Sequence, residues 1–140
     1  MFTPVSTRAA SAYKQVNIET AVDGASPHQL VRLLFDALLQ SLMTARAAMA
    51  RDDTVVKGRE IGKAVRIIEE GLKAGLNDAQ GGEVAANLRG VYSYVVRCLT
   101  QANLHNEAAK LDEAIELLQP IAEAWKQIGP QSGQTSNTGA

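Results

Sequence analysis

Two histidines and one cysteine are the only imidazole and thiol groups that this sequence offers for catalysis or metal binding: His28, His105 and Cys98. Neither histidine follows a glutamate by three residues, so the Glu-x-x-His ligands of di-iron helical bundles are missing. His28 falls in the first turn of an expected helix and His105 in an expected turn, whereas a phosphotransfer histidine belongs in the middle of a helix. Cys98 has no base near it in the sequence and is expected to be an inert, small apolar side chain. We therefore expect structural or solvent-facing roles for these residues, and no enzymatic activity, metal or cofactor.

The charge and composition of the chain narrow the classes of protein further. Its 140 residues suit one domain, and 14 Lys and Arg against 15 Asp and Glu give a formal net charge of −1. This balance offers no strongly basic surface for nucleic acid. A single cysteine cannot form an internal disulfide, which favours a reducing compartment. No segment has the pattern of a signal peptide, and no apolar stretch approaches the ~20 residues needed to span a bilayer, so we expect a soluble, cytoplasmic protein.

Apolar residues recur at helical spacing from about residue 26 to residue 128, and no segment shows the sustained alternation of a strand. The first helix is expected to open with a capping box, because Ser26 is a good N-cap, Pro27 suits the first helical position and Gln29 stands three residues after the cap. Apolar residues then cover most of the circumference of this helix. Such a helix is either the central helix of a bundle or has a second face reserved for a partner.

Caps, turns and apolar stripes predict three further helices. The second begins after Asp52 or Asp53, the third near Glu83 and the fourth at Asn106. Their core-facing positions are Val55, Ile61, Ala64, Val65, Ile68, Leu72 and Leu76, then Val84, Leu88, Val91, Tyr92, Val95, Leu99 and Ala102, and finally Leu111, Ile115, Leu118, Ala122 and Trp125. The stripe of the last helix stays in phase across Pro120, which predicts a kink and not a break.

Connections of a few residues between long helices make consecutive helices antiparallel. The expected fold is therefore all-α: an antiparallel up-down four-helix bundle over residues 26–128. Residues 1–25 are expected to form an N-terminal segment with one short cap helix around Tyr13 and Val16. Residues 129–140 are small and polar and are expected to form a disordered C-terminal tail.

The chain carries more apolar and small residues than one bundle core needs. Each glycine inside a helix costs about 0.5–1 kcal/mol relative to alanine, so four in the second helix need a reason. Two interpretations remain open: the glycines allow tight packing within the bundle, or they and the surplus apolar residues form a groove for an amphipathic partner segment. The residues concerned are Gly58, Gly62, Gly71 and Gly75, together with Ile67, Ala74, Tyr94, Val96 and part of the row Val31, Phe35, Leu39 and Leu42.

Four stretches, in this order, resemble the FliS family of flagellin export chaperones: AYKQVNIETA, ASPHQLVRLLFDALL, GLNDAQGGEVAANLRGVYSYVVRCLTQANLHN and IAEAWKQI. The most specific pieces are SPHQL at 26–30, GGEVAANL at 81–88, YSY at 92–94 and AN at 102–103. The similarity covers about residues 11–128, which is nearly all of the part expected to fold.

The resemblance implies a cytoplasmic chaperone that binds the C-terminal segment of flagellin, which is disordered when free, and keeps flagellin from polymerising before export. The implied docking partner at the flagellar type III export gate is the cytoplasmic domain of FlhA. A homodimer is compatible with the sequence, and neither nucleic acid nor a membrane is an expected partner. Two alternatives remain: a phosphorelay-type bundle, which needs a phosphorylatable histidine, and a structural homo-oligomeric bundle.

Candidate partner-binding residues follow from the surplus apolar positions. Tyr13 and Val16 are expected to cover the groove in the free protein and to be displaced when flagellin binds. The expected groove residues, each of which could instead be ordinary core, are Val31, Phe35, Ile67, Leu88, Val91, Tyr94 and Val95.

Overall fold

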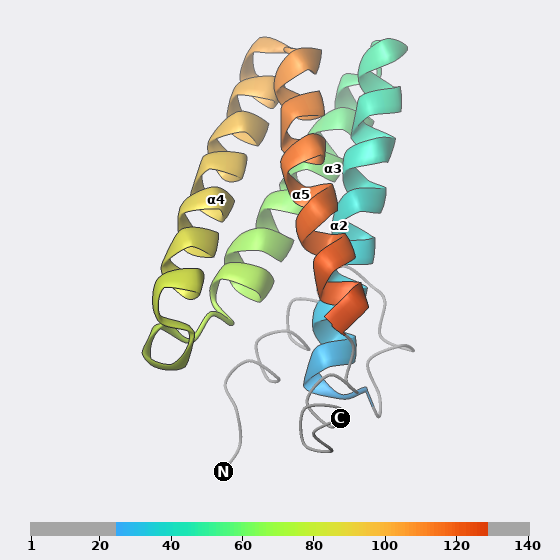
Figure 1. The fold of residues 1–140 in the computed structure, drawn as a ribbon. Coiled ribbons are helices and arrows are strands. Elements are labelled where there is room, and N and C mark those ends of the chain that lie inside the picture. The colour runs from blue at the N-terminus through green and yellow to red at the C-terminus, as the bar shows by residue number, and fades with distance from the viewer. Residues whose placement is uncertain (1–24, 129–140) are drawn as a thin grey trace.

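Helices of alternating direction make up residues 25–128, the part of the chain that the structure, a computed structural model, describes (Figure 1). In chain order they are α2 (Pro27–Ala50), α3 (Thr54–Arg66), the π-helix η2 (Ile67–Lys73), α4 (Asp78–His105) and α5 (Ala108–Ile128). α3 and η2 form one helical arm, so the bundle has four arms, and residues 25–128 contain no strand. The predicted all-α, antiparallel bundle is confirmed. The predicted cap helix and C-terminal tail lie outside the described residues.

Each arm of the bundle packs against two others. α2 contacts α3 and α5, and α4 contacts α5 and the arm formed by α3 and η2. α2 is also the one helix in residues 25–128 that is long and apolar enough to cross a membrane by length and composition, but much of it is buried in the protein core. This burial accounts for its wide apolar face. The largest fully buried side chains of the core are Leu34, Leu38, Leu42, Ile61, Ile67, Ile68, Val95, Leu99, Leu111 and Leu118.

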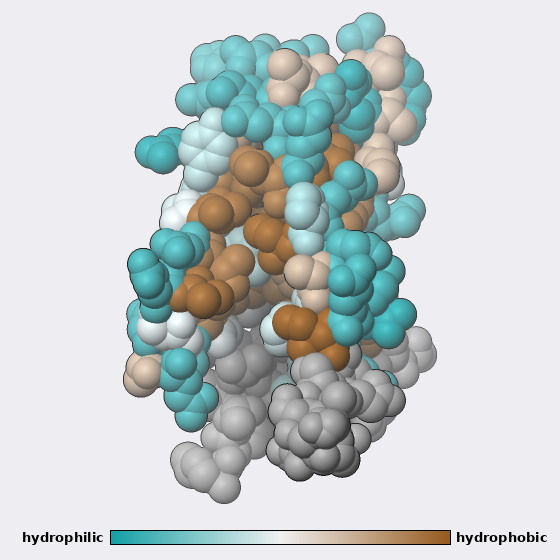
Figure 2. Space-filling model, in the orientation of Figure 1, coloured by the Kyte–Doolittle hydropathy of each residue, from teal (hydrophilic) through white to brown (hydrophobic). Residues whose placement is uncertain are grey.

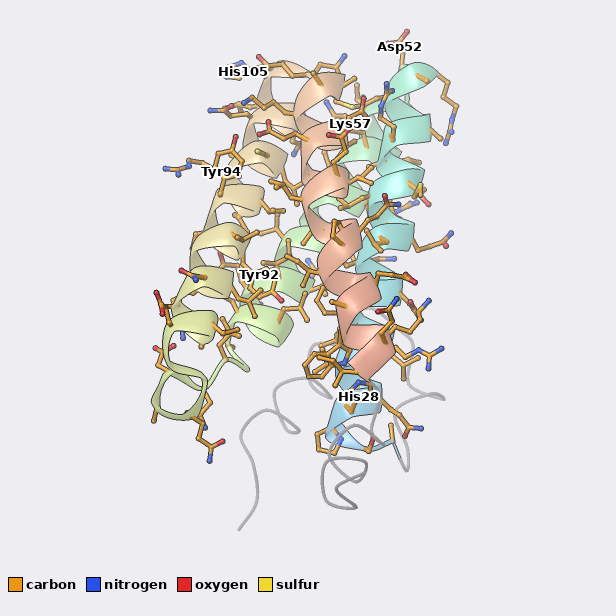
Figure 3. The ribbon with its side chains drawn as sticks, in the orientation of Figure 1. His28, Asp52, Lys57, Tyr92, Tyr94 and His105 are labelled. Atoms are coloured by element: carbon orange, nitrogen blue, oxygen red, sulfur yellow. The ribbon has the colours of Figure 1, made fainter. Side chains whose placement is uncertain are left out.

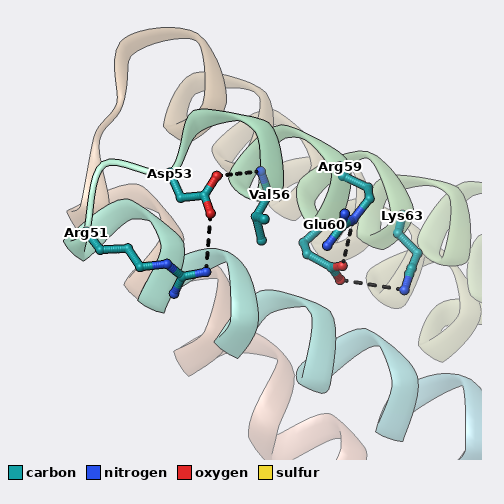
Figure 4. A network of polar contacts seen from close by, with 6 residues as sticks. All are labelled: Arg51, Asp53, Val56, Arg59, Glu60 and Lys63. Atoms are coloured by element: carbon teal, nitrogen blue, oxygen red, sulfur yellow. Dashed lines mark hydrogen bonds and ion pairs between the residues drawn. The ribbon is translucent and has the colours of Figure 1, made fainter.

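Side-chain caps fix where the first two helices begin. The backbone N–H of Gln29 donates to the Ser26 hydroxyl over 3.2 Å, and the backbone N–H of Ser26 donates to the Gln29 side chain over 2.9 Å. This confirms the predicted capping box. Asp53 caps α3 by accepting a 3.1 Å hydrogen bond from the backbone N–H of Val56 (Figure 4). Of the two predicted caps for this helix, Asp53 is therefore the correct one.

Of the predicted helix boundaries, one is correct only in part and one is wrong. α4 begins at Asp78, capped by Asn77, with one turn that ends in a kink at Gly82, and the uninterrupted helix starts just after that kink, near Glu83 as predicted. Gly82 has a φ of 53°, a left-handed conformation that glycine adopts without steric cost, and it bends α4 at this point. One helical turn therefore precedes the bend. Asn106 is the left-handed C-cap of α4, with a φ of 55°, and not the N-cap of α5. Asparagine suits both positions, so its presence in the sequence did not decide between them.

The second arm departs from a regular α-helix where the chain becomes π-helical at η2. The adjacent residues Ile67 and Ile68 at the start of η2 are both buried, although only Ile68 was expected in the core. α5 continues through Pro120 without a break, as predicted, and the kink expected there stays a prediction. Two valines assigned to core stripes are exposed instead, Val55 by 76% and Val84 by 66%.

Two charged side chains of α3 are almost fully buried, and both have partners. Lys57 donates from Nζ to the carbonyl oxygen of Asn103 over 3.1 Å and to Oδ1 of Asn106 over 3.2 Å. It thereby binds the negative, C-terminal end of α4. Glu60 lies between Arg59 at 3.3 Å and Lys63 at 3.6 Å (Figure 4). These pairs compensate the cost of removing both charges from water.

Candidate partner-binding groove

An open apolar groove of about 390 Å³ lies between the first turns of α2, the end of η2, the first half of α4 and the end of α5. Figure 2 shows hydrophobic residues gathered in the hollow between α4 and α5. The residues that line the groove are Val31, Phe35, Gly71, Leu72, Gly75, Leu76, Asn77, Gln80, Gly81, Val84, Ala85, Leu88, Tyr92, Ile121 and Trp125. None of them carries a formal charge. The groove therefore suits apolar side chains of a partner.

The structure brings three of the predicted groove residues together. Val31, Phe35 and Leu88 all line the apolar groove, although they come from two helices that do not follow each other in the chain, and Phe35 is also a buried residue of the core. Their role in binding a partner remains a prediction. Tyr13 and Val16 lie outside the described residues.

The other predicted groove residues lie elsewhere. Ile67 and Val95 are fully buried in the core, because both face the inside of the bundle, and a partner cannot reach them without opening it. Val91 and Tyr94 line a separate hollow on the outer side of α4 and α5, together with Leu117 and Glu113. The predicted set is thus divided among a groove, the core and a second surface.

Three of the lining residues have the helical phase of core residues. Tyr92 is buried in the core, as predicted, and also borders the groove, whereas Trp125 is only partly buried and Val84 is exposed. Gly71 and Gly75 also line it, and their spacing was the signal that pointed to a groove. The pair Gly58 and Gly62 has no such role. A Cβ atom at Gly62 would meet no atom within 4 Å, so close approach of another backbone does not require glycine there.

The polar groups of the second hollow are held by one another. The Tyr94 hydroxyl donates a short hydrogen bond to the Glu113 carboxylate, which raises the pKa of Tyr94 and lowers the pKa of Glu113. Cys98 is buried beside them, and burial raises the pKa of its thiol. A thiol with a raised pKa is a poor nucleophile, in agreement with the inert role expected for Cys98.

The two histidines lie at opposite ends of the bundle (Figure 3). The His28 ring is engaged: Nε2 lies 3.0 Å from the carbonyl oxygen of Trp125, and Nδ1 is buried. Neither nitrogen of His28 is therefore free to receive a phosphoryl group. His105 is exposed at the last residue of α4. Within residues 25–128 no cluster of three or more His, Cys, Asp and Glu side chains could hold a metal ion.

Burial of Tyr92 in the wall of the groove predicts a specific pH dependence of stability. Removal from water raises the pKa of the Tyr92 hydroxyl to about 12, against an ordinary value of 10. Between these values the unfolded chain has already lost this proton and the folded chain has kept it, so the free energy of unfolding falls as pH rises. A shift of this size corresponds to about 2–3 kcal/mol.

The Tyr92→Phe variant should lack this fall in the free energy of unfolding at high pH, because it has no hydroxyl group to titrate. Urea unfolding of both proteins at pH 9 and at pH 11.5 gives the loss in free energy of unfolding between these pH values for each protein. The titration of the lysines contributes equally to both losses and cancels in their difference. Equal losses in the two proteins would show that the Tyr92 hydroxyl is solvated in the native state.

The fold and the groove together define an all-α bundle with an open apolar groove. The family model described as flagellar protein FliS matches residues 9–132. The flagellar secretion chaperone FliS of Salmonella typhimurium is 50% identical over 121 residues, which cover 86% of this chain and 90% of the relative. The flagellar secretion chaperone FliS of Escherichia coli is 41% identical over 120 residues, which cover 86% of this chain and 88% of the relative. That of Bacillus subtilis is 32% identical over 117 residues, which cover 84% of this chain and 83% of the relative.

The chain therefore belongs to the FliS family, a family of flagellar secretion chaperones. This confirms the resemblance found in the sequence.

Proposed function

We propose that this protein binds the C-terminal segment of flagellin in the cytoplasm, keeps flagellin from polymerising, and delivers it to the flagellar type III export apparatus through the cytoplasmic domain of FlhA. The observation that carries the proposal is the open apolar groove of about 390 Å³ in a chain that belongs to the FliS family. An exposed apolar groove of this kind is typical of a site that receives an apolar segment of another protein.

The energetics of such a complex require a large contact. A segment that is disordered when free loses conformational entropy when it binds, which offsets part of the gain from burial. Burial of roughly 1,000–3,000 Å² is typical of such coupled folding and binding. At about 25 cal/mol per Å² of apolar area, this burial leaves a surplus after the ordering cost. The groove alone is smaller than that, so we expect the flagellin segment to extend beyond it along the bundle, with the second hollow at Val91 and Tyr94 as a candidate continuation.

The test is co-expression with the cognate flagellin. The two proteins should copurify as a soluble, stoichiometric complex that is lost when flagellin lacks its last ~40 residues, an extent that the family resemblance suggests and that is consistent with helix-in-groove binding. If neither full-length flagellin nor its isolated C-terminal segment binds, the proposal is wrong.

The N-terminal segment gives a further prediction. If Tyr13 and Val16 cover the groove in the free protein, deletion of residues 1–20 should strengthen binding of the flagellin segment or increase self-association, because the apolar groove would then be exposed to water and to other chains. Calorimetric titration and light scattering measure these two effects. An unchanged affinity together with an unchanged oligomeric state would contradict the idea of a lid.

A further inference from the structure

We infer that Trp125 is a preset aromatic anchor of the groove, which binds an apolar side chain of the partner segment, and that His28 is the positioning residue that holds Trp125 in place. This inference rests on the proposed function, since it concerns the same groove and the same partner. It assigns a main share of the binding energy to Trp125, which is held in place by a contact between the two ends of the described chain.

His28 and Trp125 are joined by three interactions. The Trp125 indole donates from Nε1 to the carbonyl oxygen of His28 over 3.1 Å, and the Nε2 nitrogen of His28 lies 3.0 Å from the carbonyl oxygen of Trp125. A carbonyl oxygen only accepts, so Nε2 carries the proton of the imidazole. The two rings are stacked, with centroids 4.7 Å apart and planes 12° apart. We refer to this reciprocal contact as the His28–Trp125 clasp.

The clasp satisfies groups that the helix ends leave without partners. Trp125 lies in the last turn of α5, where backbone carbonyl groups receive no hydrogen bond from within the helix. The Nε2–H group of His28 donates to one of these carbonyls, that of Trp125. The indole N–H is likewise satisfied by the first turn of α2. Both contacts span 97 residues of sequence, so the clasp fixes the end of α5 against the start of α2.

The clasp also decides what Trp125 offers to a partner. The histidine covers one face of the indole and the His28 carbonyl takes its only polar group, so the remaining surface that lines the groove beside Val31 and Ile121 is apolar. A partner side chain that packs there leaves the indole N–H paired, because the His28 carbonyl already accepts from it. Binding also costs no side-chain entropy at Trp125, because the indole is already fixed. Large, fixed aromatic side chains in pockets are the residues that dominate interface energies.

The chain offers a direct test because Trp125 is its only tryptophan. The full-length protein is titrated with a synthetic peptide of the last ~40 residues of flagellin, made without tryptophan and long enough for helix-in-groove binding. The tryptophan emission should shift to shorter wavelength and become less accessible to acrylamide, with the same midpoint as a calorimetric titration.

The positioning role is tested with His28→Ala and His28→Phe. The alanine variant should bind the peptide about five- to thirtyfold more weakly, the range expected for loss of a main anchor. Its free form should show lower tryptophan anisotropy. The phenylalanine variant keeps the stacked ring and should recover part of the affinity. His105→Ala, an exposed histidine at the other end of the bundle, is the matched control and should bind as the wild type does.

The outcomes separate the inference from the proposed function. If calorimetry detects binding and the tryptophan emission does not change, the inference is wrong and the proposed function stands. If the wild-type protein gives no heat of binding, the proposed function is wrong and the inference falls with it. Because the emission of the wild-type protein is itself a test, the inference is decided even where His28→Ala does not fold. Wild-type affinity and anisotropy in that variant would overturn the role of His28.

Discussion

Replacement of Val84 by lysine should weaken binding of the flagellin C-terminal segment by about thirtyfold or more and leave the free protein folded. Val84 lines the groove and is 66% exposed, so a lysine there has room and solvent in the free protein. When the partner covers the groove, the ammonium group must lose its water with no acid among the lining residues to pair with it. An unpaired charge that is buried in this way costs at least as much as the loss of a binding hot spot, which is about 2 kcal/mol.

The matched control is Val55→Lys. Val55 is also an exposed valine on a helix, by 76%, but it lies in the first turn of α3 and is not among the groove residues. Both variants add the same charge, so any general electrostatic effect on flagellin should be equal in the two. Calorimetric titration of the flagellin segment into each protein, with circular dichroism to check helix content, measures the difference. Equal affinities of Val84→Lys and the wild type would show that the partner does not cover this groove.

The fold of this protein could be predicted because local and global signals agree. The capping box at Ser26 and Gln29 and the cap at Asp53 mark helix starts through side-chain hydrogen bonds that involve only neighbours in the sequence. Short connections then make consecutive helices antiparallel. Asn106 shows the limit of such signals, because the same side chain serves as a good N-cap and as a left-handed C-cap, and only the packed structure selects one role.

The groove could be predicted only in part, since its walls depend on how far the helices lie from one another. Val84 and Trp125 are in phase with core residues, and helical phase alone does not say whether the facing space is filled. The space is left open at one end of the bundle, where Gly82 bends the start of α4 and η2 widens the second arm. Gly71 and Gly75 add to it, because they bring no side chain to the groove that they line. The FliS resemblance in the sequence named the family, and the geometry shows which of the apolar residues are accessible.

The π-helix η2 begins at the apolar pair Ile67 and Ile68. Adjacent residues of a helix both lie in the core where its apolar face is wide, as Leu34 and Phe35 of α2 do. In η2 both isoleucines are fully buried, which removes from the surface an isoleucine that the sequence offered as a partner contact. π-helical turns are rare overall but are found often at functional sites. This one contains Gly71 and Leu72, which line the groove, and Gly75 follows it there.

Truncation of Ile67 to alanine should therefore destabilise the fold and not act on the partner directly. Ile67 is 0% exposed within the core, and removal of such a side chain costs about 2–5 kcal/mol through lost burial and the cavity left behind. Urea unfolding should show this loss, while Leu104→Ala, at a side chain that is 73% exposed, should stay within about 0.5 kcal/mol of the wild type.

The milder Ile67→Val variant separates stability from binding, because it should lose only about 0.5–1.5 kcal/mol and remain folded. Its affinity for the flagellin segment should then equal that of the wild type within about twofold, since the valine still lies inside the core and the groove walls at Val84 and Trp125 are untouched. A small loss of stability together with a large loss of affinity would mean that the π-helical turn opens when the partner binds and that Ile67 becomes a contact. The burial of Ile67 would then belong to the free state alone, and η2 would be the part of the bundle that changes on binding.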